Sequence, residues 1–92
     1  MILDRFQTPS ERAQQIATRE KTKRKLQKIT QKELSERTGI SLGSIKRFEQ
    51  TGEISFVSLL KIADVLNETD GFDELFTTHI YQSIQEVIDE NN

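Results

Sequence analysis

The run SLGSIKRFEQ, residues 41–50, holds the side chains best suited to contact another molecule. The planar guanidinium of Arg47 matches the two acceptors, O6 and N7, that guanine shows in the major groove of DNA. Leu42 is suited to pack on a thymine methyl group, and Gly43 lets a backbone approach base edges closely. We therefore predict base contacts from Leu42, Gly43 and Arg47.

Donors in and before this run are suited to bind phosphate groups. Thr30, Gln31 and Ser44 carry hydroxyl or amide donors, Lys46 carries an ammonium, and the start of a helix adds unpaired backbone N–H groups. We predict phosphate contacts from Thr30, Gln31, Ser44 and Lys46. A second interpretation stays open, in which the cations of this run only face solvent and Leu42 covers the core edge or a protein partner.

No combination of residues suited to catalysis or metal binding stands out. The chain has no cysteine, which excludes disulfides, thiolate metal sites and thiol nucleophiles. His79 is the single histidine and has no partner at metal-ligand spacing. No glycine-rich phosphate loop is present. We therefore expect no catalytic residue, no metal and no cofactor, and predict that the protein is not an enzyme.

Hydropathy gives no sign of a membrane segment. No apolar run approaches the roughly 20 residues of a spanning helix, and the start MILD does not resemble a signal peptide. We expect a cytoplasmic protein, associated with the nucleoid and without a membrane partner.

The net charge of −2 hides a strong gradient along the chain. Residues 1–50 carry twelve of the thirteen Lys and Arg residues, for a local balance of +6, whereas residues 51–92 have a balance of −8. This asymmetry indicates a basic face for a polyanion and an acidic remainder that faces elsewhere. Bulk electrostatics alone cannot give binding at this net charge, so shape must contribute.

Capping signals and apolar spacing predict four helices and two shorter elements. A capping box with proline in the first helical position begins one helix at Pro9, and Thr30 with Glu33 begins a second, which Gly39 ends. The other predicted elements are a helix from Leu42 to about Thr51 between Ser41 and Gly52, a fourth from Ser55 or Ser58, a turn at 72–76 and a terminal helix near 83–88. No strand-like alternation occurs, so we predict an all-α fold, a compact bundle of four to five helices.

Residues 30–50 meet the geometric demands of a helix-turn-helix motif. The motif needs an apolar anchor in each helix, a small residue where the helices cross, a glycine in the turn and an apolar residue at the corner. These positions are Leu34, Ile45, Ser35, Gly39 and Ile40. If Ile45 and Phe48 point inward, the opposite side of the second helix presents the predicted base contacts.

The stretch ITQKELSERTGISLGSIKRFEQTGEISFVSLLKIADVL resembles the lambda-repressor-like helix-turn-helix family, the Cro/C1 or xenobiotic-response-element type. The resemblance covers roughly residues 12–76 and implies a five-helix bundle that binds a palindromic DNA operator as a homodimer. The family positions that read bases fall on Leu42, Gly43 and Arg47, and phosphate contacts fall on Gln31 and Ser44. Many members carry Ala in place of Ser35, which is a mild change. Many also carry Gln or Arg in place of Leu42 and Gly43, which favours a larger share of shape readout here.

A narrower resemblance concerns GISLGSIKRFEQTGEIS, followed by FDELF and YQSIQEV. These stretches are similar to HipB-like antitoxins, regulators encoded beside kinase-type toxins. The leading hypothesis is a sequence-specific transcriptional regulator, a repressor that acts by occupying its operator. The alternative hypothesis is an antitoxin whose acidic half neutralises a kinase-like toxin protein while its basic half represses their shared operon.

Apolar residues after the fourth helix are more numerous than a small core can hide. We expect Phe72 and Phe76 to complete the core of a DNA-binding domain at residues 1–76. A C-terminal extension, residues 77–92, then provides dimer or partner contacts through Ile80, Tyr81, Ile84 and Val87. The alternative, in which these residues only complete the intramolecular core, stays open.

The basic stretch Arg19–Lys28 spreads around its helix rather than forming one face, so we expect most of it to face solvent. Within it, Glu20 and Arg24 are expected to cover core with their aliphatic stems. Glu49 is expected to be structural, paired with Arg37 or another nearby basic side chain.

Overall fold

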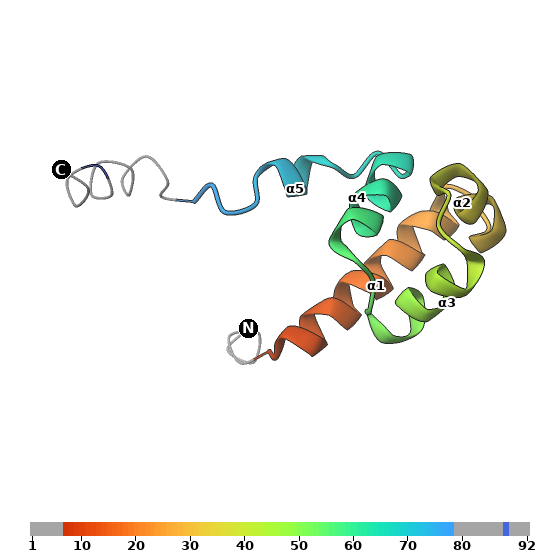
Figure 1. The fold of residues 1–92 in the computed structure, drawn as a ribbon, viewed down its shortest axis with the longest axis horizontal. Coiled ribbons are helices and arrows are strands. Elements are labelled where there is room, and N and C mark those ends of the chain that lie inside the picture. Colours follow the sequence, from red (N-terminus) through yellow and green to blue (C-terminus); the bar gives the residue numbers. More distant parts are fainter. Residues whose placement is uncertain (1–6, 79–87, 89–92) are drawn as a thin grey trace.

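The computed structural model describes residues 7–78 and residue 88. Five α-helices and no strand occur in this described part, which confirms the all-α prediction (Figure 1). The helices are α1 (Pro9–Leu26), α2 (Gln31–Thr38), α3 (Leu42–Thr51), α4 (Phe56–Val65) and the single turn α5 (Asp70–Asp73). The terminal helix predicted near 83–88 falls almost wholly outside the described residues, and the division at residue 76 stays a prediction.

Side-chain caps begin the first four helices where the sequence predicts them. In each case the capping hydroxyl accepts a hydrogen bond from the backbone N–H three residues further on, which satisfies one of the unpaired donors of the first turn. Glu33 also returns the bond to the Thr30 backbone, so the predicted capping box is complete. The four caps are Thr8, Thr30, Ser41 and Ser55, the last of which decides between the two candidates for α4.

Two glycines end α2 and α3 in the left-handed conformation. Gly39 has a φ of 76° and Gly52 a φ of 82°, values that residues with a Cβ resist. At Gly52 a Cβ would also lie 2.7 Å from the backbone carbon of Ala13 in α1. The end of α3 therefore touches the α1 backbone, and the side chain of Gln14 donates to the Gln50 carbonyl beside it.

The core forms where α1, α2, α3 and α4 meet. The long helix α1 crosses behind the others, α3 packs on α1, and α2 packs on both α3 and α4 (Figure 1). The anchors predicted for the motif, Leu34 and Ile45, are fully buried, and Phe48 is 1% exposed. The buried cluster consists of Ala17, Ile29, Leu34, Ile40, Ile45, Phe48, Ile62 and Leu66.

The prediction for the last aromatic residues is wrong in one position. Phe76, expected in the core, is 89% exposed. Phe72 is half-buried, and its ring meets that of Phe56 edge-on with centroids 6.2 Å apart. Phe56 itself stays exposed. Phe76 is exposed because α5 lasts only one turn, after which the chain leads away from the bundle (Figure 1).

Candidate nucleic-acid interface

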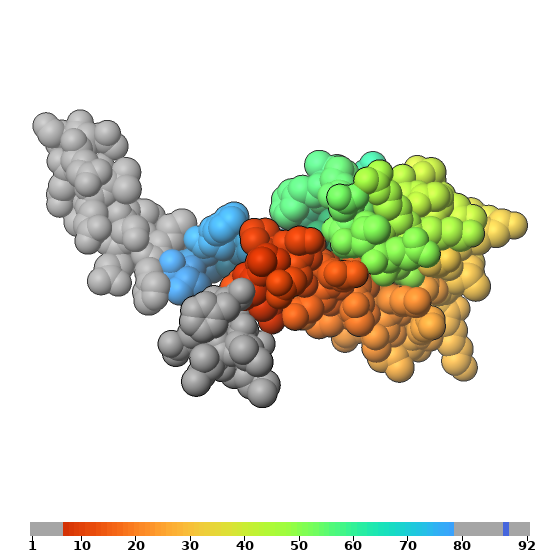
Figure 2. Space-filling view, turned by 90° about the horizontal axis from the view of Figure 1, so that it is seen from below, coloured from red at the N-terminus to blue at the C-terminus, as the bar shows by residue number. Residues whose placement is uncertain are grey.

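Helix α3 separates its residues into a buried side and an open side. Ile45 and Phe48 point into the core, whereas Gly43, Lys46 and Arg47 are exposed. The surface of residues 40–55, yellow-green to green in Figure 2, lies beside α1 and forms part of the outer face of the molecule. This division follows from apolar residues three apart on a helix that Ser41 and Gly52 bound closely.

The residues predicted to read bases share this helix. Leu42 is half-buried in the first turn, and the side chain of Arg47 is 69% exposed. A Cβ added at Gly43 would meet no atom within 4 Å, so no packing demand of the described residues explains the glycine. An open position without a side chain in mid-helix suits close approach by an outside molecule.

The predicted phosphate donors lie at the starts of α2 and α3. Thr30 and Ser41 are the N-caps, and the Ser41 hydroxyl donates to that of Ser44, with the oxygens 2.8 Å apart. Thr30, Ser44 and Lys46 are exposed, and Gln31 is half-buried. Two helix N-termini with hydroxyl groups beside them form a surface suited to anions.

Gln31 is held in place by a residue of α3. Its side-chain N–H donates to Glu49 Oε1 at a distance of 3.0 Å. Glu49 also accepts both ends of the Arg24 guanidinium, at 2.8 Å from Nε and 2.8 Å from Nη2. The third guanidinium nitrogen, Nη1, donates to the Ile29 carbonyl at 2.9 Å. Arg24 thus joins α1, the α1–α2 connection and α3. Because Glu49 is fixed by Arg24, its hydrogen bond with Gln31 also restrains the Gln31 side chain.

The carboxyl group of Glu20 lies beside this network without a hydrogen bond. Both of its oxygens are buried and have no hydrogen-bond partner, and Oε2 lies 3.9 Å from Arg24 Nε, at ion-pair distance. Burial, with the neighbouring Glu49 carboxylate as a further cause, raises the pKa of Glu20 to about 8. The raised pKa favours the protonated form of Glu20 at neutral pH.

The two partners of the ion pair have their pKa values shifted in the direction that keeps both charged. Burial by itself would raise the pKa of Glu49, but the hydrogen bonds it accepts, first of all from Arg24, hold it below the ordinary value. The same bond to Glu49 outweighs burial and raises the pKa of Arg24. One buried cation therefore faces one buried anion and one neutral acid.

Sequence reasoning missed this network in part. Glu49 is structural as expected, but its partner is Arg24 of α1 and not Arg37. The sequence suggests for Arg24 only a stem that covers the core, whereas the residue is 5% exposed and its charged head is buried. The available signal was position, because Ala17, Glu20 and Arg24 are three and four residues apart on one stripe of α1.

A second arginine–glutamate pair lies on the open side of α3. Arg47 Nη2 donates a hydrogen bond to Oε2 of Glu53, the residue that follows Gly52. Both side chains are more than 60% exposed, at 69% and 63%. Next to them is a shallow hollow lined by Ser44, Ile54, Ser55 and Ser58 as well as by the pair.

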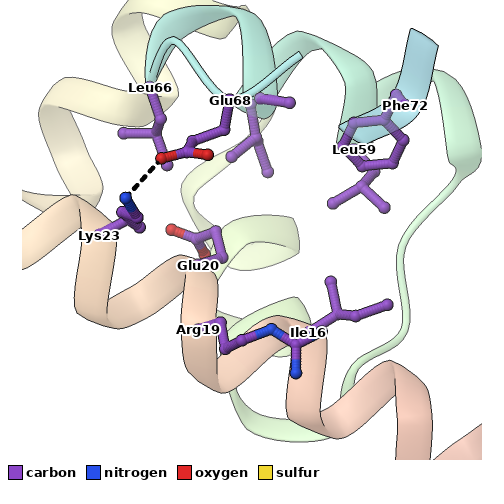
Figure 3. A pocket seen from close by; sticks show the side chains of 10 residues that line it. Ile16, Arg19, Glu20, Lys23, Leu59, Leu66, Glu68 and Phe72 are labelled. Atoms are coloured by element: carbon purple, nitrogen blue, oxygen red, sulfur yellow. Dashed lines mark ion pairs between the residues drawn. The ribbon is translucent and has the colours of Figure 1, made fainter. Parts of the chain in front are cut away.

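A different depression is apolar and lies between α1, α4 and α5. It has a volume of about 220 Å³ and is lined by Ile16, Leu59 and Phe72 among others. Figure 3 shows these side chains around the opening, with the ion pair of Lys23 and Glu68, 2.7 Å long, along one side. No residue of α3 lines it, so it is separate from the predicted DNA-binding face.

Other expectations concern residues or groups beyond this face. The predicted dimer residues Ile80, Tyr81, Ile84 and Val87 lie outside the described residues. Among the described residues no three His, Cys, Asp or Glu side chains are grouped so that they could hold a metal ion. No helix in the described part has the length and apolar character to cross a bilayer.

Comparison with known proteins agrees with this geometry. Residues 21–71, more than half of the chain, match the family model described as helix-turn-helix, of the Cro/C1 type. No curated protein and no solved structure matches the chain. The matched region begins inside α1 and ends in α5, so it contains the motif, the Arg24–Glu49 pair and the outer face of α3. The chain therefore belongs to the Cro/C1-type helix-turn-helix family, and it is a DNA-binding transcriptional regulator.

Proposed function

We propose that the protein is a repressor that occupies a two-fold symmetric operator as a homodimer. The observation that carries the proposal is the division of α3, which buries Ile45 and Phe48 and exposes Arg47. A helix of ten residues held on one side by a core, and free on the other, has the form that enters a major groove.

Arg47 is assigned to guanine, Leu42 to a thymine methyl group, and Gly43 to close approach of the backbone. Thr30, Gln31, Ser44 and Lys46 are assigned to phosphates on either side. Thr30 and Ser44 are exposed residues, and the Gln31 amide has a second N–H beyond the one given to Glu49. These contacts fix the register of α3, and the three base-facing residues supply sequence choice.

Exposed apolar residues at the end of the described domain support the dimer. Leu75 is 46% exposed and Phe76 is 89% exposed, directly before the segment that carries Ile80, Tyr81, Ile84 and Val87. Large apolar side chains grouped at one end of a small domain are typical of an interface. A two-fold operator needs a two-fold protein, and this end of the chain is where we assign the contact.

Selection of bound duplexes from random oligonucleotides, at near-physiological salt, tests the proposal. We expect a palindrome whose half-sites lie about one helical turn apart, roughly 10 base pairs. Recovery of duplexes with no common sequence would contradict sequence-specific repression.

Ending the chain at residue 78 tests the dimer separately. We expect a folded monomer by light scattering, with lower operator affinity, because two linked half-sites bind better than one. A truncated chain that remains a dimer would remove residues 79–92 from the interface.

An antitoxin is the second candidate, and the charge gradient favours it. The balance of −8 over residues 51–92 leaves an acidic half that is not needed on DNA. A kinase-like toxin encoded in the neighbouring gene, and inhibited by the purified protein, would support this role in addition to repression. A kinase-like neighbour whose activity the protein leaves unchanged would count against it.

A further inference from the structure

The ion pair between Arg47 and Glu53 uses only part of the arginine. The contact runs from Nη2 to one carboxylate oxygen, Oε2, and does not take up both ends of the guanidinium as the Arg24–Glu49 pair does. An arginine has five N–H donors, so four remain for another molecule while Glu53 keeps its hold. The guanidinium is therefore restrained in position and still able to offer a pair of donors.

The position of Glu53 is set by the backbone. Gly52 ends α3 in the left-handed conformation, and the Glu53 N–H donates to the hydroxyl of Thr51 at 3.1 Å. Thr51 in turn donates to the Arg47 carbonyl at 2.8 Å. The acid is thus brought back beside the last two turns of the helix that carries Arg47, in the loop before α4.

The surroundings offer Arg47 a competing anion site. The hollow beside the pair is lined by the hydroxyl-bearing residues Ser44, Ser55 and Ser58, and Ser55 begins α4. Serine side chains at helix starts attract phosphate groups of any DNA sequence. Without an acid at this place, Arg47 would be drawn to the backbone, which carries no sequence information.

The strengths of the two interactions decide which one gives way. An exposed ion pair of this kind changes an equilibrium by about fivefold at most, whereas a bidentate arginine–guanine contact gives roughly fivefold to 150-fold discrimination between bases. The correct base can therefore outcompete Glu53 or share the arginine with it. A single phosphate gains much less over a carboxylate that is already in place.

We propose that Glu53 is a specificity-determining residue, which positions the Arg47 guanidinium for a base and withholds its charge from phosphates of non-operator DNA. This inference rests on the proposed function, because it needs Arg47 to read a base. It adds a second residue to that readout, located outside the recognition helix and bearing the same sign of charge as the DNA.

Binding of the full chain to two duplexes tests the proposal. One is the operator obtained by selection, and the other is a random-sequence duplex of equal length, each titrated over a range of salt. Glu53→Gln should strengthen binding to the random duplex about twofold to fivefold. On the operator the gain from the removed charge should be offset by the lost positioning of Arg47, which leaves the affinity nearly unchanged. The salt dependence on the random duplex should steepen by about 0.9 in the log–log slope, because one more phosphate is neutralised.

Glu36→Gln is the matched control. It removes one exposed carboxylate from α2, so it changes the net charge of the protein equally without touching Arg47. It should strengthen binding to both duplexes by the same factor. The combined variant Arg47→Ala with Glu53→Gln should show no loss of discrimination beyond that of Arg47→Ala alone.

The outcomes separate this inference from the proposed function. If Arg47→Ala lowers discrimination but Glu53→Gln behaves like Glu36→Gln, the role of Glu53 is overturned and base reading by Arg47 stands. If Glu53→Gln changes discrimination equally with and without Arg47, Glu53 acts through its charge alone and the inference also fails. If Arg47→Ala leaves discrimination intact, Arg47 reads no base and the role of Glu53 falls with it, whereas sequence-specific repression is overturned only if the selection recovers duplexes with no common sequence.

Discussion

Two arginine–glutamate pairs, each with one member on α3, differ in burial and in geometry. Arg24–Glu49 is bidentate and buried, with side chains that are 7% and 2% exposed. Arg47–Glu53 is a single contact with both side chains mostly in solvent. The first joins α1 to α3 and restrains Gln31, whereas the second joins α3 to the loop that follows it.

Burial decides what each pair can do. Breaking the buried pair leaves a desolvated charge, so the pair is effectively permanent while the protein is folded. The exposed pair costs little to break because water and salt already weaken it. The buried pair, Arg24–Glu49, can fix the angle of α3. The exposed pair can open, so that Arg47 is able to contact DNA.

Arg24→Ala should have the largest effect, because it removes the cation of the buried pair. Removal of the cation leaves Glu49 buried and charged beside Glu20, and we expect the free energy of unfolding to fall by about 3–5 kcal/mol. Urea unfolding measures this change. Arg47→Ala is the control on the exposed pair and should alter stability by about 0.5 kcal/mol or less. Equal losses for the two variants would contradict the distinction between the pairs.

A double substitution sharpens the same point. Arg24→Met with Glu49→Met removes both charges and keeps an apolar volume, so most of the stability lost in Arg24→Ala should return. Gln31 would lose the acceptor that restrains it. We therefore expect a stable protein with weaker operator binding. A double variant with native affinity would show that the network acts only on stability.

Glu20→Gln tests the neutral acid beside the buried pair. The pKa of Glu20 rises from 4.5 to about 8 in the folded protein. Between these values the folded state holds a proton that the unfolded state lacks, so stability falls as pH rises, by at most about 1.4 kcal/mol per pH unit. Glutamine cannot titrate, and the variant should lose this slope and be more stable than the native protein near pH 8.

Urea unfolding at several pH values from about 5 to 8 measures the slope. Glu36→Gln, a change at an exposed acid, should leave it unchanged. Below this window Glu49 acts in the opposite sense, because a lowered pKa makes its contribution disappear as pH falls. A native protein whose stability does not decline between pH 5 and 8 would show that Glu20 is charged.

Arg47→Ala tests the exposed pair through DNA binding. Loss of a bidentate guanine contact should weaken operator binding by about 1–3 kcal/mol and relax sequence choice at one base pair per half-site. Fluorescence anisotropy with the operator and with single-base variants measures both effects. An equal loss on operator and random DNA would make Arg47 a phosphate contact only.

Gly43→Ala should give the smallest effect. It should change the stability of α3 and its binding to DNA in opposite directions. A Cβ there meets nothing within 4 Å, and alanine is the better helix former, so stability should rise by about 0.5–1 kcal/mol. The added methyl group should weaken operator binding if the backbone lies against base edges. A variant that gains stability and keeps its affinity would place Gly43 away from the DNA.

The sequence was sufficient for elements whose cause is local. The starts of α1 to α4 each depend on a hydroxyl and an N–H three residues away, and the ends at Gly39 and Gly52 depend on one backbone angle. The inward direction of Ile45 and Phe48 follows from their spacing on one helix. These features are predictable because every group involved lies within one turn of the chain.

The partners of charged residues were not predictable in this way. Arg24 meets Glu49 across 25 positions of sequence, and the other arginines and lysines of the chain offered equally good charges. The residue type of Phe76 favours the core, yet its position past a one-turn helix leaves it at the surface. Distance along the chain carries little information on which charge or ring ends up opposite which.

Local pattern thus determined the helices, the motif and the face of α3 that carries Arg47. Three features depend on the tertiary structure: Arg24 forms a buried ion pair with Glu49, the pKa of Glu20 is raised, and Glu53 reaches the side chain of Arg47. The two groups of features differ in how far apart along the chain the interacting groups lie. Hydrogen bonds within a turn need no packing, whereas desolvation and ion pairing depend on which surfaces the completed core brings together.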